Sequence, residues 1–488
     1  MTGRQHRVFL SLWLAATICA CNATRLPAAH LAMGFRVGEV TQSSAIVWTR
    51  VTASPERNWN GISEPQKRED RVDRFVPSTT AIADRQGACP GAAGQVRLIY
   101  APATAADADK PAAANTRTTD WAAVSAASDF THQFAVARLK PNTVYSLEVQ
   151  ARDSADSDVS ARHSGSFRTP ADKEQWQDVS FGVVTGQAYW DLDDRDGFHI
   201  YPAMQKLNLQ FLVPTGDTVY YDSESPRART VELARFHWHR MYSLPRLVEF
   251  HRRVPGYWEK DDHDTWCDDC WPTKNVPWMN PFTFAEGLSI FREQAPMGEK
   301  TYRTVRWGRG LQVWLVEGRD FRSPNDMPDG PDKTIWGKEQ LDWLKKSILA
   351  SDADFRILVS PTPIVGPDRS SKADNHSNAA FAFEGNHFRR WTREQELDNF
   401  YICCGDRHWQ YMSIDPETRL HEFSCGPASD EHAGGTPGQD ADVQPFHRVR
   451  GGFLSVAISL RDGKPNAAFR HHDVHGKVVH EFVAPSGR

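Results

Sequence analysis

The chain has 488 residues, too long for one ordinary hydrophobic core, so two domains are the natural expectation. Hydrophobic residues make up 40% of the chain and charged residues 24%, a globular composition that excludes disordered and fibrous classes. The net charge of −5 gives no signature of nucleic-acid binding, which requires clustered basic charge.

The N-terminus predicts export. Basic residues precede an apolar run at 8–16 and small residues follow it, the layout of a signal peptide over residues 1–23. Neither this run nor any later segment reaches the roughly 20 apolar residues of a membrane span. Residues 18–21 (ICAC) resemble a bacterial lipobox, which would place a lipid on Cys21; simple cleavage near Ala23 is the alternative. We therefore expect a periplasmic, cell-surface or extracellular protein whose only membrane contact is a possible lipid on Cys21.

Residues 30–171 are expected to form an all-β domain. Segments 45–50 and 96–100 are rich in β-formers, and the Pro- and Gly-containing stretch between them is typical of a long loop. The pattern L-x-P-x-T-x-Y from Leu139 to Tyr145 pairs a turn with a strand that carries an inward tyrosine. It resembles a fibronectin type III or immunoglobulin-like sandwich.

After Pro170 the pattern changes to alternating strands and helices, which predicts an α/β domain over 175–488. Short apolar runs at 211–213, 313–316, 357–359 and 400–404 are candidates for buried strands. Residues 340–349 form an amphipathic helix pattern, with Leu341, Leu344 and Ile348 on one face.

Polar clusters follow these strands, where α/β sheets bind their ligands. Residues 216–220 (GDTVY) follow the run at 211–213, residues 405–408 (GDRH) follow the run at 400–404, and 261–264 (DDHD) lies between them. Each cluster alone is weak, because Gly-Asp commonly marks a turn and acidic runs are commonly solvated loops. Together they offer the carboxylates and imidazoles that a dinuclear hydrolase needs.

Six segments in order resemble the PhoD-like alkaline phosphatase and phosphodiesterase family of the metallophosphatase superfamily. The segments are 34–50, 216–220, 261–264, 317–322 (EGRDFR), 340–344 (QLDWL) and 405–408. The resemblance implies a metallophosphoesterase-like β-sandwich flanked by helices, preceded by the N-terminal sandwich.

The resemblance also implies a site for metal ions, commonly iron with calcium, which would activate a hydroxide to attack a small phosphomonoester or phosphodiester. His263 would protonate the leaving group, and Arg319 would hold a phosphate oxygen. The implied metal ligands are Asp217, Tyr220, Asp262, Asp406 and His408.

Position 186 departs from the family pattern. The family has Ser-Cys-Gln after its first catalytic strand, with the cysteine as an iron ligand, whereas this chain has Gly186 there. A glycine offers no side-chain ligand, so the first metal would bind differently, use Asp191 or Asp193, or be absent.

Three further features are ambiguous. Asn375, His376 and Asn386 are ligand-type residues that would touch phosphate or metal, or only structure a loop. The C-x-x-C segment 267–270 is expected to be a disulfide rather than half of a zinc site, because no second such pair exists. Trp258, Trp266 and Trp271, near segment 261–264, are expected to pack in the core or to line a cleft. The cysteines at 403–404 are expected to be buried thiols.

Two other functions compete with phosphoester hydrolysis. Gly186 favours a lapsed enzyme that binds a ligand or partner through the retained scaffold, whereas the retained acidic and histidine residues oppose it. Hydrolysis of another ester on the same fold is the third possibility, because a fold does not fix its substrate.

Overall fold

The computed structural model describes residues 29–64, 79–104 and 115–485. The predicted signal peptide and the lipobox at Cys21 lie outside these ranges and stay predictions. Within the described ranges, no helix has both the length and the apolar character needed to cross a membrane.

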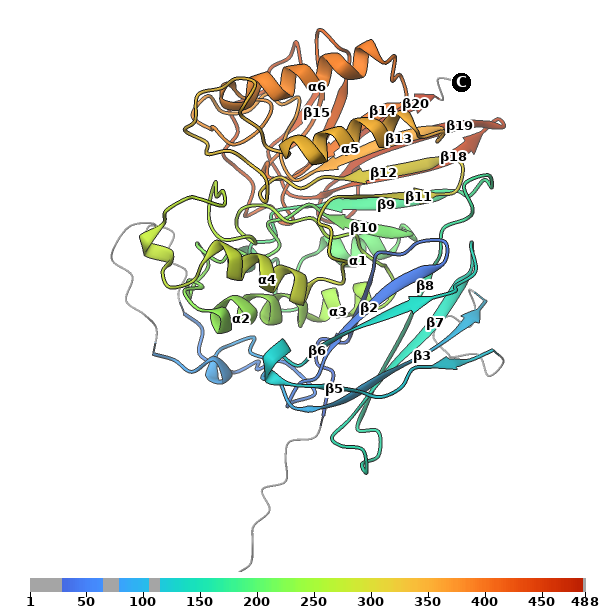
Figure 1. The fold of residues 1–488 in the computed structure, drawn as a ribbon, viewed down its shortest axis with the longest axis vertical. Coiled ribbons are helices and arrows are strands. Elements are labelled where there is room, and N and C mark those ends of the chain that lie inside the picture. The colour runs from blue at the N-terminus through green and yellow to red at the C-terminus, as the bar shows by residue number, and fades with distance from the viewer. Residues whose placement is uncertain (1–28, 65–78, 105–114, 486–488) are drawn as a thin grey trace, which may run out of the picture.

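Two antiparallel sheets form the N-terminal part, as the strand patterns predict (Figure 1). One sheet has the order β1 (Phe35–Gly38), β2 (Ser44–Arg50), β6 (Thr131–Ala137). The other has the order β4 (Arg117–Thr118), β3 (Gly94–Ala103), β7 (Val144–Arg152), β8 (Ala161–Arg168), with β5 (Ala122–Val124) paired to β3. Tyr145 points inward from β7, and its hydroxyl accepts a hydrogen bond of 2.8 Å from the backbone N–H of Lys140. This contact fixes the turn before the strand, as in a tyrosine corner.

Two mixed sheets form the centre of the second part. One has the order β10 (Phe211–Pro214), β9 (Val179–Val184), β18 (Phe453–Arg461), β19 (Lys464–His472), β20 (Val478–Pro485). The other has the order β11 (Arg303–Trp307), β12 (Leu311–Leu315), β13 (Phe355–Ser360), β14 (Phe400–Cys404), β16 (His421–Cys425), β15 (Gln410–Ile414), β17 (Phe446–Arg448). The pair β9–β10 is parallel, and so is the run β12–β13–β14–β16.

Both faces of the central strands are buried, which explains their continuous apolar sequences. On β14, Tyr401 and Cys403 face the core between the sheets, whereas Phe400 and Ile402 face the outer helices. Strands β9 and β10 alternate in the same way. The thiols of the cysteines at 403–404 are buried and free, as expected.

Helices cover the outer faces of the two central sheets. The helices α5 (Gly337–Leu349) and α6 (Ala382–Glu394) cover the seven-stranded sheet. The predicted amphipathic helix is therefore present, with Leu344 and Ile348 buried and Leu341 packed beside them. The sheet that contains β9 and β10 is covered by four helices: α1 (Ile200–Gln205), α2 (Val231–Tyr242), α3 (Pro245–His251) and α4 (Phe284–Gln294).

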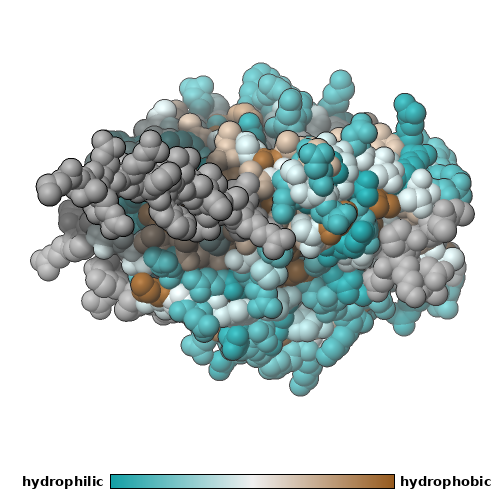
Figure 2. All heavy atoms as spheres, turned by 90° about the horizontal axis from the view of Figure 1, so that it is seen from below, coloured by the Kyte–Doolittle hydropathy of each residue, from teal (hydrophilic) through white to brown (hydrophobic). Residues whose placement is uncertain are grey.

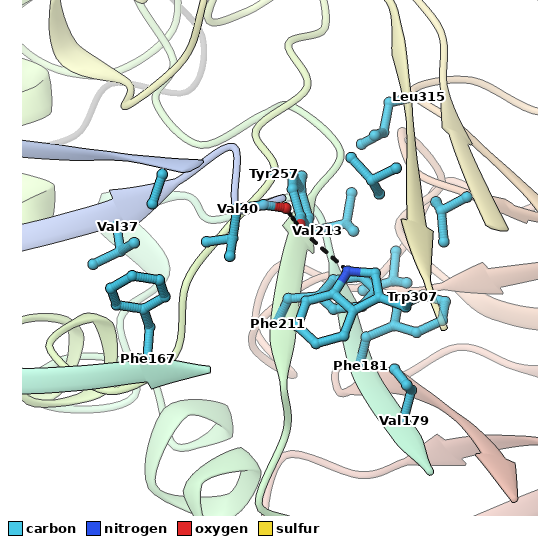
Figure 3. Close-up of a cluster of buried hydrophobic side chains, with 14 of the residues drawn as sticks. Val37, Val40, Phe167, Val179, Phe181, Phe211, Val213, Tyr257, Trp307 and Leu315 are labelled. Atoms are coloured by element: carbon cyan, nitrogen blue, oxygen red, sulfur yellow. Dashed lines mark hydrogen bonds between the residues drawn. The ribbon is translucent and has the colours of Figure 1, made fainter. Parts of the chain in front are cut away.

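One apolar core runs from the N-terminal sheets into the space between the central sheets. Figure 3 shows Val37 and Phe167 on one side of it and Phe211 and Trp307 on the other. The indole N–H of Trp307 donates to the hydroxyl of Tyr257 over 3.1 Å. The expected mixed α/β architecture is confirmed, while the domain boundary between residues 171 and 175 stays a prediction.

The surface seen in Figure 2, from below the view of Figure 1, is mainly hydrophilic. Apolar residues there form small separate groups, which is normal for a protein surface. Among the grouped ligand-type side chains, Asp217 and Asp406 follow the parallel strands β10 and β14, whereas the others lie at 261–269, after α3.

Candidate metal centre

Glycines let the loops that carry the candidate ligands approach one another closely. A Cβ at Gly216 would lie 2.3 Å from the backbone nitrogen of Asp261, and one at Gly405 would lie 2.2 Å from the hydroxyl oxygen of Thr215. Any side chain at either position would force its neighbours to move. Glycine therefore lets the loop after β10 meet the segment at Asp261 and lets the loop after β14 meet Thr215.

The aspartate after each of these glycines has a left-handed backbone. Asp217 has φ of 52° and Asp406 has φ of 60°. This conformation is uncommon for residues other than glycine and tends to occur where structure serves a function. Here it places both carboxylates at the edge where the strands end.

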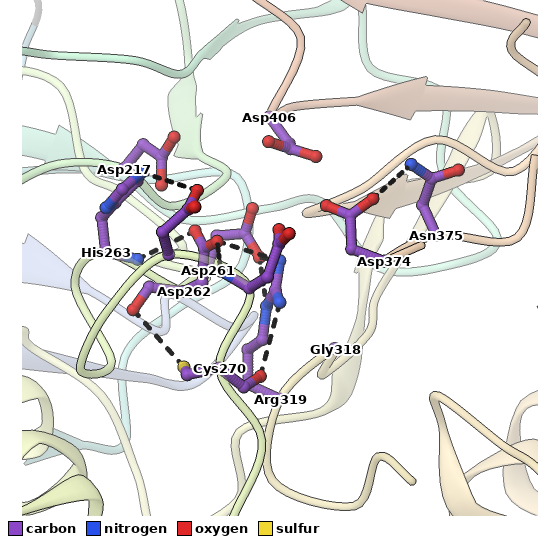
Figure 4. A network of polar contacts seen from close by, with 12 residues as sticks. Asp217, Asp261, Asp262, His263, Cys270, Gly318, Arg319, Asp374, Asn375 and Asp406 are labelled. Atoms are coloured by element: carbon purple, nitrogen blue, oxygen red, sulfur yellow. Dashed lines mark hydrogen bonds and ion pairs between the residues drawn. The ribbon is translucent and has the colours of Figure 1, made fainter. Parts of the chain in front are cut away.

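These carboxylates converge although 189 positions separate Asp217 from Asp406 (Figure 4). Carboxylate oxygens of Asp217, Asp261 and Asp406 lie within 4.8 Å of one another. A second group within the same distance joins Asp217 to Asp262 and His263. Sequence reasoning named Asp262 as the ligand of the acidic segment and missed Asp261, which stands in the same motif.

The donor set fits hard metal ions. Asp217 is 1% exposed and Asp261 is fully buried, yet Asp217 Oδ1 and Asp261 Oδ2 have no hydrogen-bond partner among the described residues. Burial, followed by the nearby acidic side chains, raises the pKa of Asp217 well above its usual value, although His263 opposes this. Buried carboxylates without partners are costly unless they bind a cation, so these oxygens suit one.

Tyr220 and His408, two of the ligands that the resemblance implies, lie near the carboxylate of Asp217. The Tyr220 hydroxyl is 3.3 Å from Asp217 Oδ2, and His408 Nε2 is 3.8 Å from the same oxygen. Desolvation and the neighbouring His432 and Arg407 lower the pKa of His408 well below its usual value. A neutral imidazole is the form that binds a metal.

His432 was missed by the sequence analysis. Its Nε2 lies 2.9 Å from the Tyr220 hydroxyl, its Nδ1 lies 2.9 Å from Asp191 Oδ2, and its ring stacks at a tilt against His408 with 4.2 Å between centroids. No motif surrounds it in the sequence, so only the folded chain reveals its place.

His263 has the surroundings of a proton donor. Its Nδ1 donates to Asp222 Oδ1 over 2.6 Å, and its side chain is 10% exposed. Burial disfavours the protonated ring, but nearby carboxylates, that of Asp222 foremost, outweigh it and raise the pKa of His263 well above its usual value. Asp222 therefore orients the ring, and this partner too was missed from the sequence.

Arg319 lies beneath the carboxylates. It is fully buried, its Nε donates to Asp261 Oδ1 over 2.6 Å, and its Nη2 is 3.7 Å from Asp262 Oδ2. The α5 residue Gln340 fixes the preceding backbone through hydrogen bonds to the N–H and C=O of Glu317. This placement supports positioning of Asp261 and does not support the expected contact of Arg319 with a phosphate.

Arg369 is a cation at a more open position. Its side chain is 33% exposed, its Nε is 3.5 Å from Asp368 Oδ1, and its charge contributes to the lowered pKa of His408. It follows β13 in a loop that the sequence analysis did not single out.

The three ambiguous residues make structural contacts. Asn375 donates to Asp368 and Asp374, while its own oxygen accepts from Ser377. His376 pairs with Glu384 over 2.8 Å, and the side-chain oxygen of Asn386 accepts from Arg389. Neither His376 nor Asn386 belongs to the described groups of ligand-type side chains.

The expected disulfide between Cys267 and Cys270 is wrong, because both are free, buried thiols. The Cys270 thiol donates to the backbone oxygen of Asp262 over 3.6 Å, and burial raises its pKa to about 12. Trp258 and Trp266 are buried and donate to Tyr242 and Phe282, so they pack rather than line a cleft.

Position 186 has no side chain to offer. Of the two alternatives, Asp191 contacts His432, whereas Asp193 accepts from the backbone N–H of His199 before α1. A Cβ on Gly186 would lie 3.2 Å from Pro427 Cβ and 3.3 Å from His432 Cδ2.

Comparisons with known proteins bear on the fold and the family. The solved structure of PhoD matches with a TM-score of 0.68 and 15% identity, covering 93% of this chain and 89% of that one. A purple acid phosphatase from seeds of yellow lupin (Lupinus luteus) matches with a TM-score of 0.58 and 11% identity, covering 92% and 73%. These matches confirm the expected metallophosphoesterase-like fold. No curated protein matches the sequence.

The sequence itself matches the PhoD-like phosphatase family over residues 181–478, more than half of the chain and nearly all of its α/β part. The matched range contains every candidate ligand described above. The chain therefore belongs to the PhoD-like phosphatase family.

Proposed function

We propose that this protein hydrolyses phosphoesters of small molecules with the help of metal ions bound by Asp217, Asp261, Asp406, Tyr220 and His408. Family membership and the clustered ligand-type side chains support a metal-dependent phosphoesterase. The observation that carries the proposal is the convergence of three carboxylates from separate loops, two of which keep an unpartnered buried oxygen.

Metal ions at these residues would supply an activated water and polarise the phosphoryl oxygens. Hard oxygen donors suit calcium or magnesium, and the Tyr–His–Asp side of the site suits a transition metal such as iron. His263, held by Asp222, would donate its proton to the oxygen of the departing alcohol. Arg319 would position Asp261 through the hydrogen bond to its Oδ1.

Arg369 would take the phosphate-binding role that the sequence analysis gave to Arg319. Its side chain is 33% exposed and its charge acts on His408, whereas the side chain of Arg319 is fully buried. A planar guanidinium can hold two phosphate oxygens, so Arg369 would bind substrate more than it would speed the chemical step.

The leaving group provides a sharp test of His263. p-Nitrophenolate leaves without a proton, whereas a simple alkoxide does not. His263→Gln should therefore lower kcat on alkyl phosphate esters by roughly 10²- to 10⁴-fold. It should lower kcat on p-nitrophenyl esters far less, with metal content near that of the wild type. His387→Gln, at an exposed position of α6, is the matched control.

Equal losses on both kinds of ester would show that His263 does not act as the proton donor. A wild type that holds metal but cleaves neither mono- nor diesters would favour the lapsed scaffold, for which Gly186 is the supporting feature. Cleavage of carboxylic esters alone would favour the third function.

A further inference from the structure

The loop after β16 brings a histidine to the metal centre. Its backbone is tied to neighbouring strand ends: Ala428 N–H donates to Gly186 O over 3.3 Å, and Gly434 N–H donates to His408 O over 3.0 Å. His432 lies between these two anchors, and its side chain is 9% exposed. The loop is thus held in place on both sides of the histidine.

Four donor atoms form a connected group at this point. His432 Nε2 is 2.9 Å from the Tyr220 hydroxyl oxygen, which is 3.3 Å from Asp217 Oδ2, which is 3.8 Å from His408 Nε2. Nitrogen and oxygen donors bound to one transition metal at about 2.0–2.2 Å are roughly 3 Å from one another. The His408 and His432 rings lie 4.2 Å apart between centroids, so a cation would draw the two ends of this chain of donors together.

The other ring nitrogen of His432 is engaged in the way that metal-binding histidines require. Its Nδ1 lies 2.9 Å from Asp191 Oδ2, so it carries the proton and Nε2 keeps its lone pair. A carboxylate partner of this kind fixes the ring orientation and strengthens the imidazole as a ligand. Trp190 packs edge-on against both Tyr220 and His432 and holds the two rings together.

The ring of His432 also occupies the space beside Gly186. A side chain at position 186 would begin 3.3 Å from His432 Cδ2, and the φ of Gly186 is +58°, which disfavours other residues. Gly186, in the loop after β9, therefore leaves the space that the ring of His432, from the loop after β16, occupies.

We propose that His432 is a metal ligand that completes one site with Tyr220, Asp217 and His408, in place of a side chain at position 186. The proposal rests on the proposed metal-dependent function, because it assumes that these donors bind a cation. A cation held there would take the place of the present hydrogen bond between Tyr220 and His432, and the phenol proton of Tyr220 would pass to solvent.

Cobalt titration of the full-length protein tests the assignment without measuring activity. Metal-free wild type, His432→Ala and Asp191→Asn would be titrated with Co²⁺ by calorimetry and visible absorption, after circular dichroism has shown that each is folded. His432→Ala should bind cobalt at least about 100-fold more weakly, and Asp191→Asn about 10- to 100-fold more weakly. His447→Ala, whose ring contacts Thr436, should bind like the wild type.

Chemical rescue separates ligation from a structural effect. Free imidazole should restore the cobalt spectrum of His432→Gly and should not change that of the wild type. His432→Ala that binds cobalt with wild-type affinity and spectrum would overturn the proposal, and so would a wild type that binds no cation. A wild type that binds cobalt through His432 but cleaves no phosphoester would contradict only the proposed function.

Discussion

His251 links the stability of this fold to pH, because its ring is buried and, in the part of the chain that the structure describes, no ion pair stabilises its protonated form. It is 1% exposed at the end of α3 and packs against Tyr242 and Trp258 with 5.5 Å between ring centroids in each case. Neither ring nitrogen makes a hydrogen bond of ordinary geometry within the described residues. Burial, and then the charge of Arg36, lower its pKa to about 3, although a contact with the Val254 backbone opposes this.

The sign follows from the lowered pKa. In the unfolded chain His251 takes up a proton near pH 6.5, whereas in the folded protein it stays neutral down to about pH 3. Protonation of His251 in the unfolded chain therefore lowers the free energy of unfolding progressively as pH falls from about 6.5 to about 3. Between about pH 7 and about pH 5 the linked loss is about 2 kcal/mol, from 1.36 kcal/mol per unit of pH below the unfolded pKa.

Urea unfolding of the wild type and His251→Phe at these two pH values measures the effect. Other groups titrate in both proteins, so the comparison is the difference between their pH dependences, expected to be about 2 kcal/mol in favour of the variant at the lower pH. His387→Phe, at an exposed position, should follow the wild type. Parallel curves for wild type and His251→Phe would refute the reasoning.

Two further substitutions test the packing around the site and the N-terminal sheets. Gly405→Ala should lower the free energy of unfolding by about 1–3 kcal/mol and weaken metal binding, because its methyl group would meet the Thr215 hydroxyl at 2.2 Å. Unchanged metal affinity would contradict the close approach of the two loops. Asp129→Asn should cost about 3–5 kcal/mol in urea unfolding, because it leaves the buried guanidinium of Arg50, now 3.0 Å away, without its counter-charge. A loss below about 1 kcal/mol would show that the pair is solvated.

The central fold could be predicted from the sequence because both faces of its strands are buried. Short apolar runs such as 400–404 suit strands that are buried on both faces, and each of the four runs became a strand in the central sheets. The predicted helix was found too, but it begins at Gly337, three positions before Gln340. Its first turn carries polar residues, so the apolar pattern could not reveal it.

The candidate site was only partly predictable, because its members come from loops that the fold brings together. Asp217, Asp406 and His408 stand in short motifs at strand ends, where local sequence is informative. Asp222 and His432 stand outside such motifs. Asp222 joins the site through a hydrogen bond to His263, and His432 joins it through hydrogen bonds to Tyr220 and Asp191. No local pattern encodes that kind of contact.

Gly186 shows why a missing motif residue is weak evidence against a metal site. The sequence alone left open whether the first metal binds differently, uses Asp191 or Asp193, or is absent, and it named no replacement donor from a distant loop. In the fold, Thr185 after β9 and Pro427 after β16 form a β-bridge, so the loops after these two strands lie side by side. Either loop can then direct a side chain toward Tyr220, and a Cβ at position 186 would lie 3.2 Å from Pro427 Cβ and 3.3 Å from His432 Cδ2. A glycine at position 186 thus leaves room for the imidazole of His432, and loss of a ligand follows only where no neighbouring loop can supply one.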